Sequence, residues 1–339
     1  MKRIILSATC AFSIFAAFCA QPFWLGGDIS GTTANEAHGH FTKNRDGVTT
    51  ETTQLMKDYG MNATRLRVWV NPKDGFSSPE DVLTMAKRSQ ALGMPVMIDF
   101  HYSDWWADPG KQFPPKAWEG LTLDETAKAL ADHTKSTLQL LKDNGIDVKW
   151  VQVGNETTHG FLWPMGRFEE NPENYARLTK AGCDAVKEIY PDAKTIIHLD
   201  DGFNQKLYDS VFDSLKANGV EWDIIGMSVY PFWAIDGNKE ESEIMTLVDS
   251  IANINHLKKK YGSEIMIVET GVDAREPQKG KQFIDALIKA ARELTDGACT
   301  GVFYWAPEID ADAAYHLGAF SNGMPTAIMD AFKEASEIQ

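Results

Sequence analysis

The stretch Trp150-Val-Gln-Val-Gly-Asn-Glu156 decides how the rest of the chain is interpreted. Its apolar, β-branched run is typical of a buried strand that ends at Gly154. An amide and an acid, Asn155 and Glu156, follow directly, where packing gives no reason for an acid. A lone glutamate at a strand end is often merely solvated, but a second run, Ile265-Met-Ile-Val-Glu269, ends in the same way. Together they predict a pair of carboxylates that act on one bond.

Length and composition favour one large domain. The chain has 339 residues, of which 43% are hydrophobic and 24% are charged, so it can bury a sizeable core. No polar or Pro/Ser-rich linker and no short repeat divides the sequence. Length alone would allow two domains, but α/β barrels of this size are often single. We therefore expect a targeting segment at residues 1–20 and one catalytic domain at residues 21–339.

The first twenty residues resemble a secretory signal peptide. Lys2 and Arg3 precede an apolar run over residues 4–18, and small residues follow where a signal peptidase would cut. The apolar run is short for a bilayer span. Cys19 could instead carry a lipid, but the phenylalanine before it fits a lipobox poorly. We expect export with cleavage near residues 19–21, to the periplasm or the medium, in preference to a surface lipoprotein.

The charge balance argues against nucleic-acid and membrane partners. Loss of Lys2 and Arg3 with the targeting segment takes the net charge from −15 to −17. Such a chain repels nucleic acids and anionic membranes, whereas an uncharged polymer is a suitable partner. We expect a monomer that binds a neutral polysaccharide and does not insert into a membrane.

No sequence motif predicts a metal or a cofactor, and we expect neither. His101 and His198 lie near aspartates on separate predicted strands, and two aspartates lie near His316, but no HExxH, calcium-loop or cysteine cluster occurs in the sequence. Cys183 and Cys299 have no CxxC or Cys/His spacing. We expect both cysteines to be free and buried, with a disulfide between them as the alternative.

Eight predicted strands alternate with eight predicted helices. The strands are expected at residues 23–30, 63–70, 95–101, 150–154, 194–200, 222–229, 265–271 and 299–305. The helices are expected at residues 48–59, 79–92, 123–144, 172–190, 204–217, 240–261, 278–294 and 326–336. This alternation predicts an α/β protein with a single-domain (β/α)8 TIM barrel. An open doubly wound sheet is the alternative, but Gly26-Gly27-Asp28 is not the GxGxxG turn that it would require.

In such a barrel, the carboxyl ends of all strands open onto one face. The polar and aromatic residues expected there are Asp28, Arg65, Asp99, His101, Asn155, Glu156, His198, Asp200, Tyr230, Glu269 and Trp305. The fourth and seventh strands face each other across the opening, so Glu156 and Glu269 would meet. Paired carboxylates are typical of glycoside hydrolysis, with one as acid and the other as nucleophile or base. Hydrogen bonding from Tyr230 and the charge of Arg65 would keep Glu269 ionised.

Five tryptophans lie at or just beyond predicted strand ends, where flat rings can stack on sugars. They are Trp105, Trp106, Trp163, Trp233 and Trp305. Any one of them could simply cap the barrel core. Five on one rim predict that two or three contact a sugar ligand.

A series of motifs in this order resembles glycoside hydrolase family 53. The motifs are Gly27–Ser30, Arg65–Pro72, Asp99–Pro109, Val151–Glu156, Gly160–Pro164, Ile197–Gly202, Ser228–Trp233, Val268–Thr270 and Phe303–Trp305. They run from the first predicted strand to the eighth, so the resemblance covers essentially the whole chain after the targeting segment. Each motif is weak by itself, but the ordered set is highly specific.

The resemblance implies a secreted arabinogalactan endo-β-1,4-galactanase that acts on the galactan side chains of pectin by a retaining mechanism. It implies Glu156 as the general acid/base and Glu269 as the nucleophile. It also implies residues that surround the reacting sugar or line the cleft. We expect these substrate-binding residues to be Arg65, Asp99, His101, Trp106, Asn155, Trp163, His198, Tyr230, Trp233 and Trp305.

Some positions depart from the family pattern. Trp105 stands where the family usually has a small polar residue, and Ala306 replaces a usual glutamate. Val272-Asp-Ala follows Glu269 where an aromatic residue is often found. The loop after the eighth strand is short, which puts in doubt the calcium site that some bacterial members carry there. These changes affect subsites and product length and leave both glutamates intact.

Two other functions remain open at this stage. One is a related barrel hydrolase that cuts β-1,4-mannan or β-glucan, which only a substrate comparison would distinguish. The other is a glycan-binding protein without catalysis. The two intact glutamates argue against the second alternative.

Overall fold

The computed structural model describes residues 22–237 and 242–338, so the expected targeting segment lies outside the described residues. Eight parallel strands close into a barrel in the order β1-β10-β9-β8-β7-β4-β3-β2. They are β1 (Trp24–Asp28), β2 (Ala63–Val68), β3 (Val96–Phe100), β4 (Val148–Val153), β7 (Lys194–Leu199), β8 (Ile224–Val229), β9 (Glu264–Thr270) and β10 (Cys299–Trp305). The predicted single-domain (β/α)8 barrel is confirmed.

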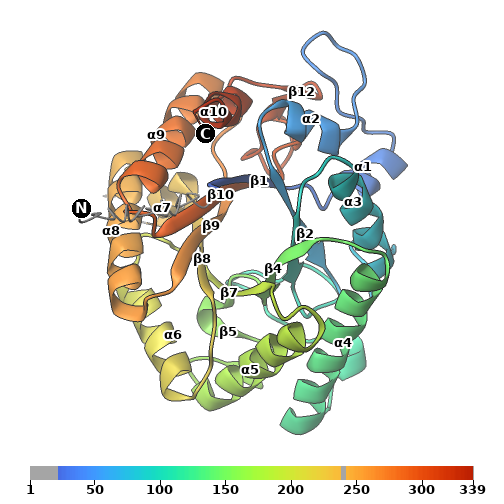
Figure 1. Ribbon diagram of the computed structural model, residues 1–339, viewed down its shortest axis with the longest axis vertical. Coiled ribbons are helices and arrows are strands. Elements are labelled where there is room, and N and C mark those ends of the chain that lie inside the picture. The colour runs from blue at the N-terminus through green and yellow to red at the C-terminus, as the bar shows by residue number, and fades with distance from the viewer. Residues whose placement is uncertain (1–21, 238–241, 339) are drawn as a thin grey trace, which may run out of the picture.

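Helices surround the barrel, and short hairpins lie in its loops (Figure 1). The helices are α1 (Thr32–Ala37), α2 (Thr52–Asp58), α3 (Pro79–Ala91), α4 (Leu123–Asp143), α5 (Pro172–Ile189), α6 (Gln205–Ala217), α7 (Pro231–Gly237), α8 (Glu243–Tyr261), α9 (Pro277–Glu293) and α10 (Ile328–Ser336). The hairpins pair β5 (Gly160–Phe161) with β6 (Gly166–Arg167), and β11 (Phe320–Ser321) with β12 (Met324–Pro325).

Capping residues explain where the observed helices differ from the predicted ones. The helix predicted over residues 48–59 begins only at Thr52, because the Glu51 side chain accepts a hydrogen bond from the backbone N–H of Gln54. The helix predicted over residues 240–261 begins at Glu243, with Ser242 as its cap, and residues 238–241 lie outside the described residues. The sequence analysis missed the short helices α1 and α7.

The decisive stretch on β4 alternates between the two sides of the barrel wall. Trp150 joins the cluster inside the barrel, where its ring meets Phe303 edge-on at 6.1 Å. Val151 and Val153 belong to the larger cluster between the strands and the helices. Gln152 points inward like Trp150, one layer nearer to the carboxyl ends, and hydrogen-bonds to Arg65. The interior is therefore apolar at the amino end of the barrel and polar at the carboxyl end.

Gly26 on β1 is required by the packing inside the barrel. A Cβ atom at this position would lie 2.2 Å from the ring of Phe303, which is fully buried. We expect Gly26→Ala to destabilise the protein by about 1–3 kcal/mol, because the rigid ring has little room to move. Gly237→Ala is the control, since its Cβ would meet nothing within 4 Å. Urea unfolding of both variants measures the difference, and equal stabilities would contradict this account of the interior.

Three other expectations concern the described part of the chain. Cys183 and Cys299 are both buried and free. Among the described residues, no helix is long and apolar enough to cross a membrane. Over the same residues, no group of three or more His, Cys, Asp or Glu side chains is placed to hold a metal ion.

Candidate active site

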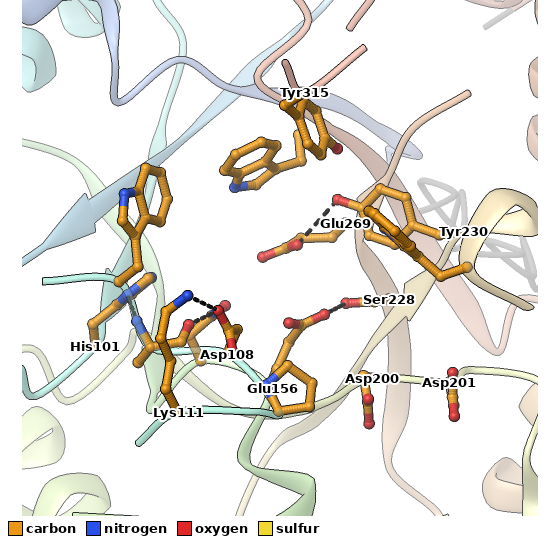
Figure 2. Close-up of a pocket in the computed structure, with 16 residues that line it drawn as sticks. His101, Asp108, Lys111, Glu156, Asp200, Asp201, Ser228, Tyr230, Glu269 and Tyr315 are labelled. Atoms are coloured by element: carbon orange, nitrogen blue, oxygen red, sulfur yellow. Dashed lines mark hydrogen bonds and ion pairs between the residues drawn. The ribbon is translucent and has the colours of Figure 1, made fainter. Parts of the chain in front are cut away.

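A pocket of about 400 Å³ lies at the carboxyl ends of the barrel strands. It is shown in Figure 2, where Glu156 and Glu269 project into it from different strands. The residues that line it are His101, Trp106, Ala107, Asp108, Pro109, Lys111, Asn155, Glu156, Asp200, Asp201, Ser228, Tyr230, Trp233, Glu269, Trp305 and Tyr315. The two glutamates that the sequence analysis paired are thus brought together.

The backbone turns sharply after β4 and directs Glu156 into this pocket. Gly154 has φ +85°, and Glu156 itself is left-handed with φ 46° and ψ 55°. This conformation is unfavourable for a residue with a side chain, so neighbouring contacts must hold it. The backbone N–H of Glu156 donates to His198 Nδ1 at 3.3 Å, and its carboxyl Oε1 accepts a hydrogen bond from Ser228 Oγ at 2.6 Å.

Glu269 reaches the pocket through an irregularity in β9. The pairing with β8 skips one residue, because Met227 faces Ile267 whereas Ser228 faces Glu269. Val268 packs in the apolar cluster inside the barrel, and Glu269 lines the pocket on the same side of the wall. A β-bulge produces this arrangement, since it places two successive side chains on one face. Regular alternation would have turned Glu269 away from the pocket.

The two carboxyl groups have different electrostatic surroundings. Glu269 Oε1 forms an ion pair of 2.8 Å with Arg65 Nη2, and its Oε2 accepts a hydrogen bond of 3.1 Å from Tyr230 Oη. Burial raises the pKa of Glu269 to about 7, with Asp99 and Asp28 acting in the same direction, while Arg65 and Tyr230 oppose this shift. Burial, Glu269 and Asp200 all raise the pKa of Glu156, and only the Ser228 hydrogen bond lowers it. Both pKa values are raised, and the contacts of Arg65 and Tyr230 favour the carboxylate form of Glu269 over that of Glu156.

Arg65 is the centre of a buried network beneath the pocket. Its guanidinium is completely buried and lies 2.8 Å from Asp28, 2.9 Å from Asp99 and 2.8 Å from Glu269. The same group donates to Asn155 Oδ1 at 2.8 Å. These three carboxylates raise the pKa of Arg65 and outweigh its desolvation. One cation thus connects the ends of β1, β3, β4 and β9.

His198 is neutral and fixes the orientation of Ser228. Burial lowers its pKa well below the ordinary value, with Arg65 acting in the same direction. Its Nδ1 faces two donors, the backbone N–H of Glu156 at 3.3 Å and the amide of Gln152 at 3.0 Å, and one acceptor, Asn155 Oδ1 at 3.2 Å. The two donors favour the tautomer with the ring proton on Nε2. Nε2 then donates to Ser228 Oγ at 2.8 Å. The Ser228 hydroxyl proton is consequently directed at Glu156 Oε1.

Aromatic side chains form two walls of the pocket. The rings of Trp106 and Trp305 are 5.5 Å apart, and Trp305 packs edge-on against Tyr315 at 4.8 Å. The Arg67 guanidinium lies 3.8 Å from the Trp106 ring centre and holds that ring in place. Trp233 is 48% exposed and has a free face toward the pocket. These rings provide surfaces on which a sugar can stack.

Four of the predicted substrate-binding residues do not line the pocket. Arg65, Asp99 and His198 are fully buried and are not among the residues that line the pocket, and they hold neighbouring groups in position. Trp163 is half-buried on the loop after β4, where its indole N–H donates to the His159 carbonyl. Its ring lies beside Arg167 at 4.6 Å, outside the pocket. Strand-end positions identified the right face of the barrel but not the depth of each side chain.

Several pocket residues were given no role in the sequence analysis. Asp108 and Lys111 form an ion pair of 2.6 Å, and Tyr315 comes from the loop after β10. These residues lie in loops, where no periodicity marks them. Ser228 is on β8 within a quoted motif, and its inward position followed from the strand alternation. Asp201 also lines the pocket and directly follows Asp200 in the chain. The sequence analysis expected Asp200 on the rim but gave it no role.

Asp200 contributes to the raised proton affinity of Glu156, after burial and Glu269. Its carboxylate accepts a hydrogen bond from Thr158 Oγ1, lines the same pocket and raises the pKa of Glu156. We expect Asp200→Asn to lower that pKa, so that the alkaline limb of the kcat/KM profile moves to lower pH while the acid limb stays. Asp132→Asn, on the outer surface of α4, is the control. An unchanged alkaline limb in Asp200→Asn would contradict this coupling.

A closed (β/α)8 barrel with two unlike carboxyl groups and aromatic walls at its carboxyl end defines a glycoside hydrolase. Residues 24–335 match glycosyl hydrolase family 53. The chain belongs to this family.

Known proteins agree with this assignment. The chain is 33% identical over 305 residues to a probable arabinogalactan endo-β-1,4-galactanase A of Aspergillus terreus, an alignment that covers 83% of this chain and 84% of the relative. It is 31% identical to the arabinogalactan endo-β-1,4-galactanase A of Aspergillus niger, with coverage of 88% and 89%. A solved fungal β-1,4-galactanase superposes with a TM-score of 0.82 at 29% identity and covers 91% of this chain and 98% of that structure.

Proposed function

We propose that this protein is a retaining endo-β-1,4-galactanase that cleaves internal bonds of β-1,4-galactan, including type I arabinogalactan side chains of pectin. The observation that carries the proposal is the pair of carboxyl groups, Glu156 and Glu269, which line one pocket and differ in the groups that contact them. Membership in family 53 and the names of its galactanase relatives support the choice of substrate.

In the first step, Glu269 acts as the nucleophile and Glu156 as the acid. The Glu269 carboxylate attacks the anomeric carbon, and the bond from that carbon to the leaving oxygen breaks. Glu156 donates its proton to this oxygen, so the shortened chain departs with a free hydroxyl. Arg65 and Tyr230 keep Glu269 ionised before the attack.

In the second step, Glu156 acts as a base. It removes a proton from water while the water oxygen attacks the anomeric carbon, and the bond to Glu269 breaks. Two inversions give a product with the configuration of the substrate. This mechanism requires the two carboxyl groups to lie about 5–5.5 Å apart.

Ser228 decides which oxygen of Glu156 carries the transferred proton. Because its hydroxyl donates to Oε1, that oxygen is occupied as an acceptor, and the proton resides on Oε2. The chain His198–Ser228–Glu156 therefore orients the acid for the leaving oxygen. These residues touch one another through hydrogen bonds of 2.8 and 2.6 Å.

The pocket walls suit an uncharged sugar chain. Trp106, Trp233 and Trp305 offer apolar faces for pyranose rings, and the Asn155 side chain lies beside Glu156, where it can meet a hydroxyl of the reacting sugar. Asp108, Asp200 and Asp201 add acceptors for hydroxyl groups and repel acidic sugars. These features favour a neutral galactan over the uronate backbone of pectin.

Product analysis tests the proposal. Linear β-1,4-galactan, β-1,4-mannan and a soluble β-1,4-glucan are incubated with the protein, and products are followed over time by chromatography and by NMR of the anomeric protons. We expect rapid release of mixed oligosaccharides from galactan, with the β-anomer formed first. Preferential cleavage of mannan or glucan, binding without cleavage, or initial formation of the α-anomer would overturn the proposal.

We also propose that the protein is exported, on the basis of residues 1–20. Expression of the full chain in a bacterial host, followed by mass spectrometry of the exported protein, tests this. We expect cleavage near residues 19–21. A lipid on Cys19 or retention of the first residues would contradict it.

A further inference from the structure

A second cavity, of about 880 Å³, lies between the loop after β1 and the loop after β10. Its size is in the range of small-molecule sites, which is about 300–1,000 Å³. Its lining includes Asn35, Phe41, Glu308, Asp310, Tyr315 and Asn322. None of the functions described above uses this cavity.

The cavity adjoins the active-site pocket. Tyr315 lines both cavities, with its ring packed against Trp305 at 4.8 Å. In Figure 2, Tyr315 lies on the opposite side of Glu269 from Glu156. Because the leaving sugar must lie on the Glu156 side of the cleaved bond, the other end of the chain, which carries the non-reducing end, extends toward Tyr315. A long substrate is therefore directed from the reacting sugar to the second cavity.

A buried carboxyl group with one unpaired oxygen lines the cavity. Glu308 is 8% exposed, and within the described residues its Oε2 has no hydrogen-bond partner. A side chain at Gly31 would approach Glu308 Oε1 to 3.5 Å and Asn35 Nδ2 to 3.6 Å, so these two groups face the same narrow space. Burial raises the pKa of Glu308 to about 8, so that it is a neutral acid at pH 7. A buried carboxyl oxygen without a hydrogen-bond partner is costly, and a ligand hydroxyl would satisfy it.

The walls of the cavity are held in place before any ligand binds. The backbone N–H of Lys43 donates to the Gly323 carbonyl at 2.8 Å and so joins the two loops. Asp310 accepts hydrogen bonds from the backbone N–H groups of Asn322 and Gly323, at 2.9 and 2.5 Å. Above them Phe41 is 52% exposed and lines the cavity. An exposed ring beside hydrogen-bonding groups is suited to a sugar.

We propose that this cavity is a distal binding site for the non-reducing portion of the galactan chain, in which Phe41 stacks on a sugar ring and Glu308 hydrogen-bonds to sugar hydroxyl groups. The inference rests on the proposed galactanase function and adds to it a place for sugars beyond Tyr315. It predicts that the enzyme prefers chains long enough to reach the cavity. Short oligosaccharides would react without using it.

Phe41→Ala tests the site, and Val48→Ala is the matched control. Both residues are exposed on the same loop, but Val48 lies outside the cavity lining. We expect Phe41→Ala to lower kcat/KM on long galactan chains by roughly fivefold, a loss of about 1 kcal/mol, and to leave short oligosaccharides unaffected. Val48→Ala should match the wild type on both. Equal rates for Phe41→Ala and wild type on long chains would overturn the distal site while leaving the galactanase function intact.

Glu308 requires a comparison of two substitutions. Glu308→Gln keeps a neutral hydrogen-bonding group and should retain most activity on long chains, whereas Glu308→Ala should lose as much as Phe41→Ala. Thermal unfolding of both variants shows whether Glu308→Ala remains folded. If Glu308→Gln were impaired as much as Glu308→Ala, or if both were unimpaired, the proposed hydrogen bond to sugar would be wrong.

Oligosaccharides with a fluorophore at the reducing end test the direction of the chain. If the non-reducing portion occupies the cavity, the wild type releases short labelled fragments, and Phe41→Ala shifts the distribution toward longer ones. An opposite shift would overturn the direction, and no shift would overturn the site. A wild type that cleaves none of these oligosaccharides would instead contradict the galactanase function itself.

Discussion

Glu269→Ala is expected to reduce galactan cleavage by at least about a thousandfold, or ~4 kcal/mol of transition-state stabilisation, because no other group can form the covalent intermediate. Glu156→Ala is expected to cost about 10²- to 10⁴-fold on the polymer, since protonation of a poor leaving group is lost. An activated aryl galactoside needs no such proton, so its first step should be nearly unaffected by Glu156→Ala. Initial rates on the two substrates measure the difference.

Azide identifies the role of each glutamate. In Glu269→Ala, azide takes the place of the missing nucleophile and should give the α-galactosyl azide from an activated substrate. In Glu156→Ala, azide attacks the covalent intermediate and should give the β-product. Glu264→Ala is the control, because Glu264 begins the same strand β9 at the far end, where it pairs with Lys194. An exchange of the two azide products would reverse the proposed roles.

Arg65→Met is expected to destabilise the fold by about 3–5 kcal/mol, because it leaves Asp28, Asp99 and Glu269 buried without their shared cation. The same change should raise the pKa of Glu269. Since Glu269 must be ionised to attack, the acid limb of the activity profile should then move to higher pH. Urea unfolding and the pH dependence of kcat/KM measure the two effects.

Arg88→Met provides the comparison for Arg65. Arg88 forms ion pairs with Glu36 at 2.7 Å and Glu51 at 3.2 Å, but its side chain is 30% exposed. Such pairs contribute about 0–1 kcal/mol, so this variant should remain nearly as stable as the wild type. If Arg65→Met were no less stable than Arg88→Met, the buried network would not stabilise the fold. If the acid limb of Arg65→Met did not move, Arg65 would not favour the ionised form of Glu269.

The barrel was predictable because each strand is an apolar run between recognisable turns. The sequence also predicts the location of Glu156 and Glu269, since every parallel strand of a barrel presents its carboxyl end to the same face. It could not predict the depth of neighbouring side chains. Arg65 and His198 are on the expected strands, yet they lie beneath the pocket and not in its wall.

Two kinds of feature were not accessible from periodicity. One is the bulge in β9, where the backbone departs from alternation and places Val268 and Glu269 on the same side. The other is the set of loop residues, such as Lys111 and Tyr315, whose positions depend on how the loops fold over the barrel. Both depend on three-dimensional packing that a pattern of residue types does not encode.

The left-handed backbone of Glu156 lowers the stability of the fold but places the acid in the pocket. Selection for stability therefore opposes selection for activity at this residue. A residue with a side chain costs about 1–2 kcal/mol in this conformation, whereas glycine adopts it freely. Burial of the acid adds to the cost. Laboratory evolution for heat resistance alone would therefore favour glycine at position 156 and yield a sturdier but inactive protein. Any thermostability screen of this enzyme should consequently retain an activity requirement at every round.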